Sequence, residues 1–252
     1  MKRSSLFGGI GRALSNRIYR RYFFSFTFSM IGRWLHRMAA GWLAWELTGS
    51  TSWLGIVAFA DALPMVILSI FAGAVGDRMG YLRVIRASQL GTSCVAALFA
   101  GLTLGGVITI EMVVALTLVF GSLEALSTPV RMSLVHSLVG REDLSPAIAL
   151  GSAMFNGARL VGPAIAGTLI LWLEIGAVMA IGTFTFFQFF VVLLFIQIDE
   201  PDREHDISFD VFADIMTGVK YVVGDPGIRF LLLLLGVTGL LVRPFMELLP
   251  GF

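Results

Sequence analysis

Long apolar runs, each about as long as a membrane-crossing helix, follow one another along most of the chain. Bilayer hydrocarbon is about 30 Å thick and a helix rises about 1.5 Å per residue, so a spanning helix needs roughly 20 mainly apolar residues. Short turns or charged connections separate the runs. The pattern predicts seven transmembrane helices, at 22–48, 53–76, 84–104, 108–130, 146–173, 177–198 and 228–252.

The basic residues fall in alternate connections between these runs. Of the 18 Lys and Arg residues, 14 lie in the N-terminal tail, 77–86, 131–143 or 199–229, and none lies in the turns at 49–52, 105–107 and 174–176. Because cytoplasmic loops carry an excess of Lys and Arg, this asymmetry predicts a cytoplasmic N-terminus. The protein is therefore expected to be a multi-pass membrane protein with its N-terminus in the cytoplasm.

Composition agrees with a membrane protein and excludes several other classes. Hydrophobic residues make up 57% of the chain and charged residues 14%, and the net charge of +1 gives no indication of a nucleic-acid partner. Cys94 is the single cysteine, and no Cys/His spacing suggests a metal, so we expect neither a metal nor another cofactor. The sequence lacks G-x-S-x-G and H-E-x-x-H, and no lysine for a retinal Schiff base follows Lys220. We therefore expect a protein that is not an enzyme.

The expected fold class is an all-α membrane protein with four parts. These are a cytoplasmic basic tail (1–21), a six-helix transmembrane bundle (22–198), a cytoplasmic connector with an amphipathic helix (199–227) and a seventh transmembrane helix (228–252). The chain stops directly after an apolar run, at Leu249-Pro-Gly-Phe252, without a polar tail. This ending predicts a truncated chain.

One connection, between the second and third runs, carries a distinctive motif. It contains Gly73, Asp77, Arg78, Gly80 and Arg83 in the pattern G-x-x-x-D-R-x-G followed by basic residues. Gly73 and Gly76 permit close helix approach, and Gly80 permits the positive φ of a tight turn. Asp77 at a helix C-terminus opposes the helix dipole, so it needs cationic or N–H partners.

This motif resembles motif A of the major facilitator superfamily, and other segments resemble the branch that includes the enterobactin exporter. Leu82 departs from the motif, because the family often has a basic residue there. The resemblance implies a protein of the bacterial inner (plasma) membrane, with a six-helix N-terminal bundle plus helix seven and with the C-terminal half of the complete protein missing. It also implies that Asp77, Arg78 and Arg83 form a cytoplasmic latch between the two halves. A loop that only joins two helices is the alternative.

The fifth run contains Gly162, Pro163 and Gly167, which resemble the glycine-proline motif associated with antiporters. Proline frees a backbone carbonyl, and small residues allow close packing, so this segment is a candidate helix bend. Ordinary packing of small residues explains the same pattern, and both interpretations remain open.

Charged residues inside the apolar runs are the candidates for a substrate cavity or for coupling. A charge in the bilayer is costly, so it should face a wet cavity or an opposite charge. Arg37 and Asp61 lie at similar depth and are expected to pair, whereas Arg33 and Arg159 lack obvious partners and are expected to contact substrate. Glu124 and Arg159, flanked by Asn156, form a second expected polar set. The cavity candidates are Arg33, His36, Arg37, Asp61, Glu124, Asn156 and Arg159.

Together these features predict a secondary active transporter that works by alternating access. We expect efflux of a small molecule, with an anionic or siderophore-like substrate and with protons as the coupling ion, carried by Asp61, Glu124 or His36. The expected partners are the lipid bilayer, this small molecule and the missing C-terminal half. The alternative is a transport-incompetent fragment or one half of a membrane scaffold.

Overall fold

The computed structural model describes residues 8–198, 223–231, 233–234 and 237–238. It divides into two compact units, 1–203 and 204–252, and each is described by itself. All regular secondary structure within the described residues is helical. The expected all-α fold class is thus confirmed.

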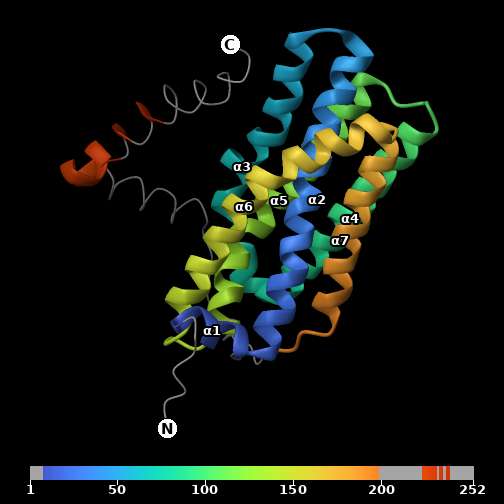
Figure 1. The fold of residues 1–252 in the computed structure, drawn as a ribbon. Coiled ribbons are helices and arrows are strands. Elements are labelled where there is room, and N and C mark those ends of the chain that lie inside the picture. Colours follow the sequence, from blue (N-terminus) through green and yellow to red (C-terminus); the bar gives the residue numbers. More distant parts are fainter. Residues whose placement is uncertain (1–7, 199–222, 232, 235–236, 239–252) are drawn as a thin grey trace. The chain divides into compact units, whose positions relative to one another are not determined.

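Seven helices make up the described part of the first unit (Figure 1). Six of them are long and lie where the first six apolar runs were predicted, and a short helix precedes them. Their bounds are α1 Gly8–Ser15, α2 Arg17–Thr48, α3 Thr51–Met79, α4 Tyr81–Leu104, α5 Ile110–Leu138, α6 Leu144–Trp172 and α7 Ile175–Leu194.

Five of these helices, α3 to α7, contain a segment long and apolar enough to cross a membrane. Helix α2 has 32 residues but carries charges along its length, including Arg33 and Arg37. It packs against α3, α5, α6 and α7, so much of its central part faces other helices, although Arg37 is exposed. This position explains how α2 tolerates charges that a lipid-facing helix would not.

The long helices run alternately up and down and form one elongated bundle (Figure 1). Helix α3 packs mainly on α5, and α4 packs mainly on α7. One apolar cluster, which includes Tyr22, Ile85 and Phe189, lies toward the start of α2, and another, which includes Leu35, Phe99 and Met179, lies toward its other end. The bundle therefore has apolar packing above and below its middle.

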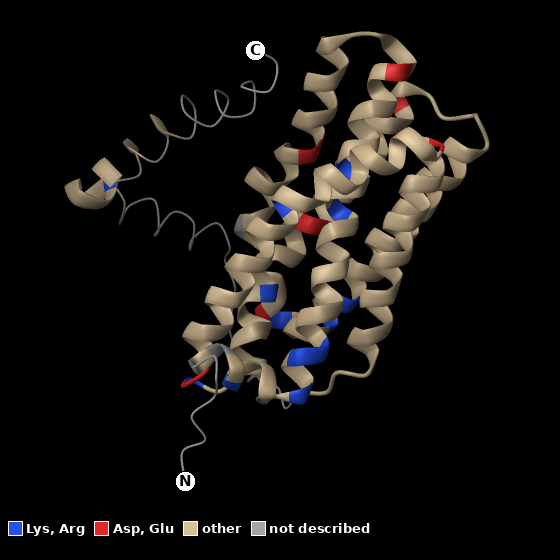
Figure 2. Cartoon of the chain, in the orientation of Figure 1, with Lys and Arg blue, Asp and Glu red and all other residues tan. Residues whose placement is uncertain are grey.

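Exposed arginines gather at the end of the bundle where α2 begins, which we call the basic end (Figure 2). It carries Arg17, Arg20 and Arg21 of α2, and α3, α5 and α7 also end here. The distribution follows the alternation of basic connections in the sequence. The side of the membrane that this end faces stays a prediction.

The expected basic tail at 1–21 differs from the structure. Residues 8–15 form α1, which packs on α6, and α2 begins at Arg17 instead of residue 22. Arg12 of α1 pairs with Asp143 just before α6, and Asn16 caps α2 by accepting hydrogen bonds from the N–H groups of residues 18 and 19. These polar contacts hold a helix where the high density of arginines suggested a plain tail.

The connection expected at 77–86 is also shorter than predicted. Helix α3 continues to Met79 and α4 begins at Tyr81, so Gly80 alone separates them. Its φ of 88° is in the region that favours glycine. The charges of this segment had suggested a loop, but they lie on helix ends.

In the second unit, Asp225 begins a helical segment. Its carboxylate accepts hydrogen bonds from the N–H groups of Gly227 and Ile228, in the manner of an N-cap. The described parts of the predicted seventh helix, 228–231, 233–234 and 237–238, are helical. The remainder of that helix and the predicted amphipathic connector at 199–222 lie outside the described residues.

Candidate functional site

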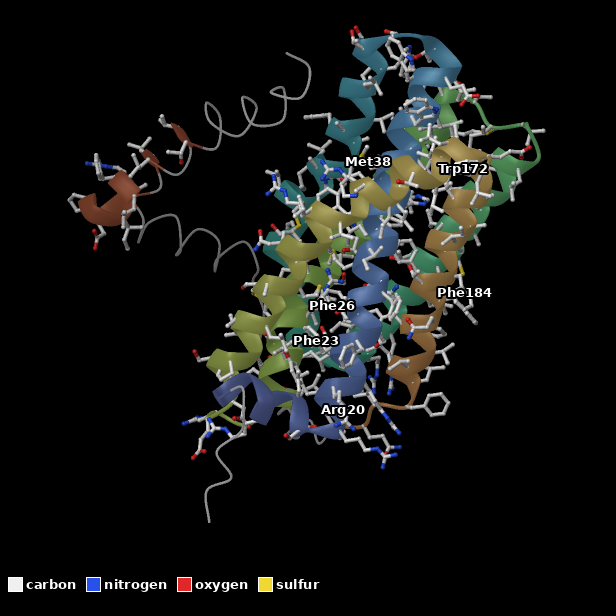
Figure 3. The ribbon with its side chains drawn as sticks, viewed as in Figure 1. Arg20, Phe23, Phe26, Met38, Trp172 and Phe184 are labelled. Atoms are coloured by element: carbon white, nitrogen blue, oxygen red, sulfur yellow. The ribbon has the colours of Figure 1, made fainter. Side chains whose placement is uncertain are left out.

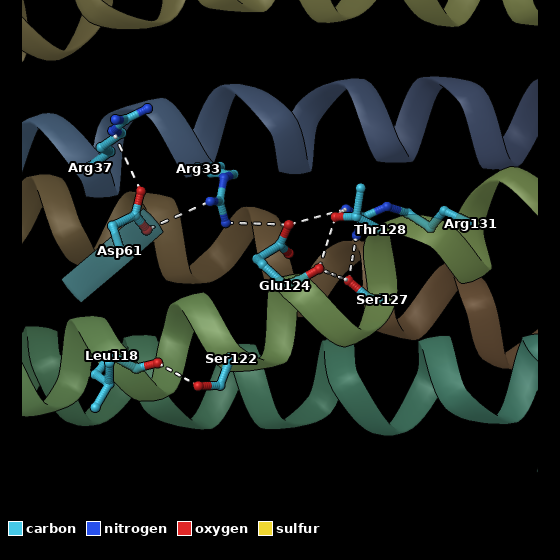
Figure 4. Close-up of polar contacts among 9 residues, drawn as sticks. All are labelled: Arg33, Arg37, Asp61, Leu118, Ser122, Glu124, Ser127, Thr128 and Arg131. Carbon is cyan, nitrogen blue, oxygen red and sulfur yellow. Dashed lines mark hydrogen bonds and ion pairs between the residues drawn. The ribbon is translucent and has the colours of Figure 1, made fainter. Parts of the chain in front are cut away.

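Three charged residues meet in the middle of the bundle. Arg33 of α2 lies 3.6 Å from Asp61 of α3, between Nη2 and Oδ1, and 3.3 Å from Glu124 of α5, between Nη1 and Oε2. Arg33 therefore bridges two acids on two helices (Figure 4). The expectation that Arg33 lacks an obvious partner was wrong. It assigned Asp61 to Arg37 alone and Glu124 to Arg159.

Arg37 lies one helical turn from Arg33 and contacts the same acid. Its Nε is 3.6 Å from Oδ2 of Asp61, which is the pair that the depth of the two residues predicts. Its guanidinium also lies over the Trp34 ring, 5.5 Å from the ring centroid. With 43% of its side chain exposed, compared with 24% for Arg33, Arg37 is the more accessible of the two cations.

Arg131 extends the chain of charges on the other side of Glu124. Its Nη2 donates to Glu124 Oε2 at 3.1 Å and to Thr128 Oγ1 at 2.8 Å, and its Nη1 donates to Ser127 Oγ at 2.9 Å. The side chain is buried and lies over the Phe26 ring. Arg131 therefore belongs to the interior of the bundle.

From the sequence, Arg131 was expected in a connection, because the fourth apolar run was expected to end at residue 130. Helix α5 instead continues through Pro129 to Leu138. The spacing of Glu124, Ser127, Thr128 and Arg131 is i, i+3, i+4 and i+7, so all four share a helix face. That spacing was the signal that could have identified Arg131.

The ion-pair network consists of Arg33, Arg37, Asp61, Glu124 and Arg131. With both acids ionised, its three cations and two anions leave one excess positive charge. Arg33 and Glu124 lie near the midpoints of α2 and α5, so this charge is deep in the bundle. Because an unbalanced charge is costly there, an anionic ligand near Arg37 would be stabilised.

His36 makes no ion pair or hydrogen bond with the network within the described residues, although Arg33 lies over the same Phe120 ring as His36, 5.5 Å from the ring centroid. His36 is buried and stacks on Phe120 at a centroid distance of 4.8 Å, and Phe99 and Phe186 lie edge-on to its ring. Neither ring nitrogen has a hydrogen-bond partner within the described part of the chain. The sequence placed His36 beside Arg37, but the two side chains leave α2 in different directions.

Asn156 and Arg159 are exposed on α6 and do not join Glu124, so the second polar set expected from the sequence was wrong. Asn156 donates to the carbonyl of Ser152, one turn earlier. Arg159 makes no ion pair with any described residue. It lies near the middle of the 29-residue helix, where an exposed cation requires water or an anion.

The glycines of the motif at 73–83 differ in their surroundings. A Cβ at Gly76 would lie 2.9 Å from Val130 Cγ2, so Gly76 permits the close approach of α3 and α5, whereas Gly73 faces open space. Tyr81 donates a 2.8 Å hydrogen bond from its hydroxyl to Asp77 Oδ1 across the Gly80 break. Asp77, Arg78 and Arg83 are all exposed at the basic end.

The candidate bend in α6 includes one glycine with a packing role. A Cβ at Gly162 would lie 2.4 Å from Trp34 Cβ of α2, whereas nothing lies within 4 Å of a Cβ at Gly167. Pro163 stands inside the helix and cannot donate to the carbonyl of Arg159. Trp34, which was not among the expected site residues, thus connects α6 to Arg37.

Comparison with known proteins identifies the family. A family of the major facilitator superfamily described as "Transmembrane secretion effector" matches residues 12–251. The chain belongs to this family. It is 30% identical to the staphyloferrin A transporter of Staphylococcus aureus over 152 residues. This aligned segment covers 60% of this chain and 38% of that protein.

Two further relatives of this major facilitator protein are an uncharacterised MFS-type transporter of Bacillus subtilis and the multidrug efflux pump Tap of Mycolicibacterium fortuitum. The first is 27% identical over 179 residues, or 69% of this chain and 40% of the relative. The second is 29% identical over 235 residues, or 85% of this chain and 54% of the relative. The chain thus spans between about two fifths and about half of the length of these relatives.

Proposed function

We propose that the protein is a secondary active transporter that exports a small anionic molecule across the bacterial plasma membrane by alternating access. Membership of the major facilitator superfamily supports transport, and relatives named as a staphyloferrin A transporter and a multidrug efflux pump are in keeping with export. The excess positive charge of the ion-pair network is the observation that carries the choice of an anion.

In this proposal Arg37 is the primary substrate contact. It is the most exposed cation of the network, and Asp61 already orients its guanidinium. A carboxylate or catecholate of a siderophore-like molecule would bind its remaining N–H groups. Arg159 is proposed as a second contact, because an exposed cation in the middle of an apolar helix should face a wet cavity.

Asp61 and Glu124 are the proposed coupling acids, with protons as the coupling ion. They share Arg33, so a proton bound to either acid removes one of the two attractions that position this arginine. Arg33 would then pair more strongly with the acid that remains ionised. Protonation would thereby change the packing of α2 against α3 and α5, which is the kind of local charge change that biases a two-state transporter.

Motif A is proposed to act as the latch between two halves of the complete protein. Asp77, Arg78 and Arg83 are exposed at the basic end, where a second bundle could contact them. Gly80 and the hydrogen bond from Tyr81 to Asp77 keep the ends of α3 and α4 close together. The latch residues would then move together with α3, the helix that carries Asp61.

Transport by the full-length protein in inside-out membrane vesicles tests this proposal. With an imposed proton gradient, wild type should accumulate a carboxylate siderophore in preference to a lipophilic cation. Arg37→Gln should raise KM for the siderophore roughly tenfold or more, which corresponds to the loss of a charge-assisted hydrogen bond of about 1.5–3 kcal/mol. Arg141→Gln, an exposed arginine remote from the network, is the control.

Two results would contradict parts of the proposal separately. An unchanged KM in Arg37→Gln would mean that Arg37 does not contact substrate and only forms a structural pair with Asp61. A well-folded wild type that accumulates neither probe would favour the alternative, a transport-incompetent half or membrane scaffold. This alternative agrees with the length of the chain, which spans about two fifths to about half of the relatives it matches.

A further inference from the structure

A groove at the basic end combines one cation with apolar walls. It has a volume of about 330 Å³ and is lined by Arg21 of α2 with Val192, Phe195 and Ile196 at and after the end of α7. Arg21 forms no ion pair with another described residue, and 75% of Phe195 is exposed. A cation and an apolar surface are thus presented together at the rim of the bundle.

The adjoining end of α7 is already neutralised by another arginine. Arg86 of α4 donates from Nε to the carbonyl of Leu193 at 3.0 Å and from Nη2 to that of Ile196 at 2.7 Å. These bonds place the Arg86 guanidinium at the C-terminus of α7, where carbonyl groups and the helix dipole favour a cation. Arg21 is therefore not needed to cap α7, and within the described residues its charge has no ion-pair partner.

An exposed apolar face of α7 runs toward the middle of the bundle from Leu194, the residue next to Phe195. Phe184, Phe187, Val191 and Leu194 follow at spacings of three or four residues, so they share one helix face. Phe184 and Phe187 are 69% and 50% exposed. Figure 3 shows Phe184 on the outer side of α7, where a membrane-spanning helix would contact lipid.

We propose that this groove binds an anionic phospholipid, with Arg21 on the phosphate and with Phe195 and the apolar face of α7 against an acyl chain. A guanidinium suits a phosphate, and the stripe on α7 suits a chain attached to it. A soluble anion would use Arg21 alone and leave Phe195 in water. Phospholipids with net negative charge are enriched at the cytoplasmic surface, which is the predicted side of the basic end.

Thermal unfolding of the full-length protein in detergent, with added phospholipid, tests this site. Phosphatidylglycerol should raise the unfolding midpoint of wild type by about 2–4 °C more than phosphatidylcholine with the same acyl chains. Arg21→Gln should remove most of this difference and Arg21→Lys should keep much of it. Arg141→Gln removes an exposed arginine from the same end but outside the groove, and should behave as wild type.

Two further measurements separate a lipid from a free anion. Inorganic phosphate at the same concentration should leave the midpoint unchanged, and an equal shift with phosphate would overturn the assignment to a lipid. Phe195→Ser should reduce the phosphatidylglycerol retained in native mass spectrometry. Equal loss of the lipid preference in Arg21→Gln and Arg141→Gln would overturn the site, because it would reflect only general attraction to the basic end. Since none of these measurements involves transport, the result is independent of the proposed function.

Discussion

Arg33 Nη1 and Glu124 Oε2 lie 3.3 Å apart at the midpoints of α2 and α5, and each residue also has a second partner of opposite charge. Arg33 contacts two acids, Asp61 and Glu124, and Glu124 contacts two arginines, Arg33 and Arg131. Loss of either residue therefore affects contacts on both sides. The two acids of the network should differ in their structural importance for this reason.

Glu124→Gln should destabilise the protein more than Asp61→Asn. Removing one member of a buried pair costs about 3–5 kcal/mol, and Glu124 neutralises the well-buried Arg131. When Asp61 is neutralised, Arg33 still pairs with Glu124. Arg37 loses its acid, but this arginine is exposed, so water partly screens its charge. Thermal unfolding in detergent measures both effects.

A second substitution tests whether charge is the cause. Arg131→Gln added to Glu124→Gln should recover part of the lost stability, because the uncompensated buried cation is removed. Glu111→Gln, at the exposed start of the same helix, is the control and should cost no more than about 1 kcal/mol, the contribution of an acid to the N-terminal helix dipole. A double variant less stable than Glu124→Gln would show that packing, not charge balance, dominates at this position.

Gly162→Ala should lower the stability of the protein, whereas Gly167→Ala should not. The new Cβ at 162 would lie 2.4 Å from Trp34 Cβ, so α2 and α6 must separate, at a cost of about 1–3 kcal/mol. At 167 the Cβ meets nothing, and alanine should stabilise the helix by about 0.5–1 kcal/mol. Unfolding midpoints and transport rates of both variants measure the difference.

Trp34→Ala should fail to rescue Gly162→Ala, because alanine keeps the Cβ that obstructs the helix. Arg37 also lies over the Trp34 ring, so separation of α2 and α6 should displace this arginine and raise KM for an anionic substrate. If Gly162→Ala and Gly167→Ala had equal stability, α6 would not be held against α2 at the observed distance.

Asp77→Asn should slow transport while the protein remains folded. The substitution keeps the shape of the side chain and an acceptor for the Tyr81 hydroxyl, and it removes a negative charge from the C-terminal turn of α3, where the helix dipole disfavours it by about 0.3–1 kcal/mol. The helix itself should therefore tolerate the substitution. Vesicle transport and thermal unfolding, measured on the same preparation, separate the two effects.

The matched variant for Asp77 is Tyr81→Phe, which removes the hydroxyl donor and leaves the charge of Asp77 in place. It should transport nearly as well as wild type if the latch depends on charge. Wild-type rates in Asp77→Asn would leave the latch without support, and equal losses in both variants would assign the effect to the hydrogen bond across Gly80.

The sequence predicted the positions of six long helices because each apolar run is bounded by turns or charges, and it predicted the Arg37–Asp61 contact because depth along a helix follows from residue count. It did not predict which side of a helix each charge occupies. The central α2 is surrounded on several sides, so its apolar pattern has no single direction. The burial of His36 and the exposure of Arg37 therefore could not be read from it. Arg131 was missed for a different reason: the fourth apolar run was expected to end at residue 130, yet α5 continues to Leu138.

The orientation of the bundle is tested best by cysteine labelling at two exposed positions on opposite ends. Arg141 lies in the turn between α5 and α6 at the basic end, and Glu174 lies just before α7 at the other end. Arg86 is a poor position despite its charge, because its side chain binds carbonyls of α7. Cys94 is exposed and must first be changed to serine, so that each variant carries one thiol.

In intact cells a membrane-impermeant maleimide should label Glu174→Cys and leave Arg141→Cys unmodified, and permeabilised cells should show labelling of both. The expected result follows from the arginines at the basic end, which should remain in the cytoplasm. Labelling of Arg141→Cys in intact cells, with Glu174→Cys protected, would reverse the orientation. It would also place the exposed motif A residues Asp77, Arg78 and Arg83 outside the cell, because they share the basic end with Arg141.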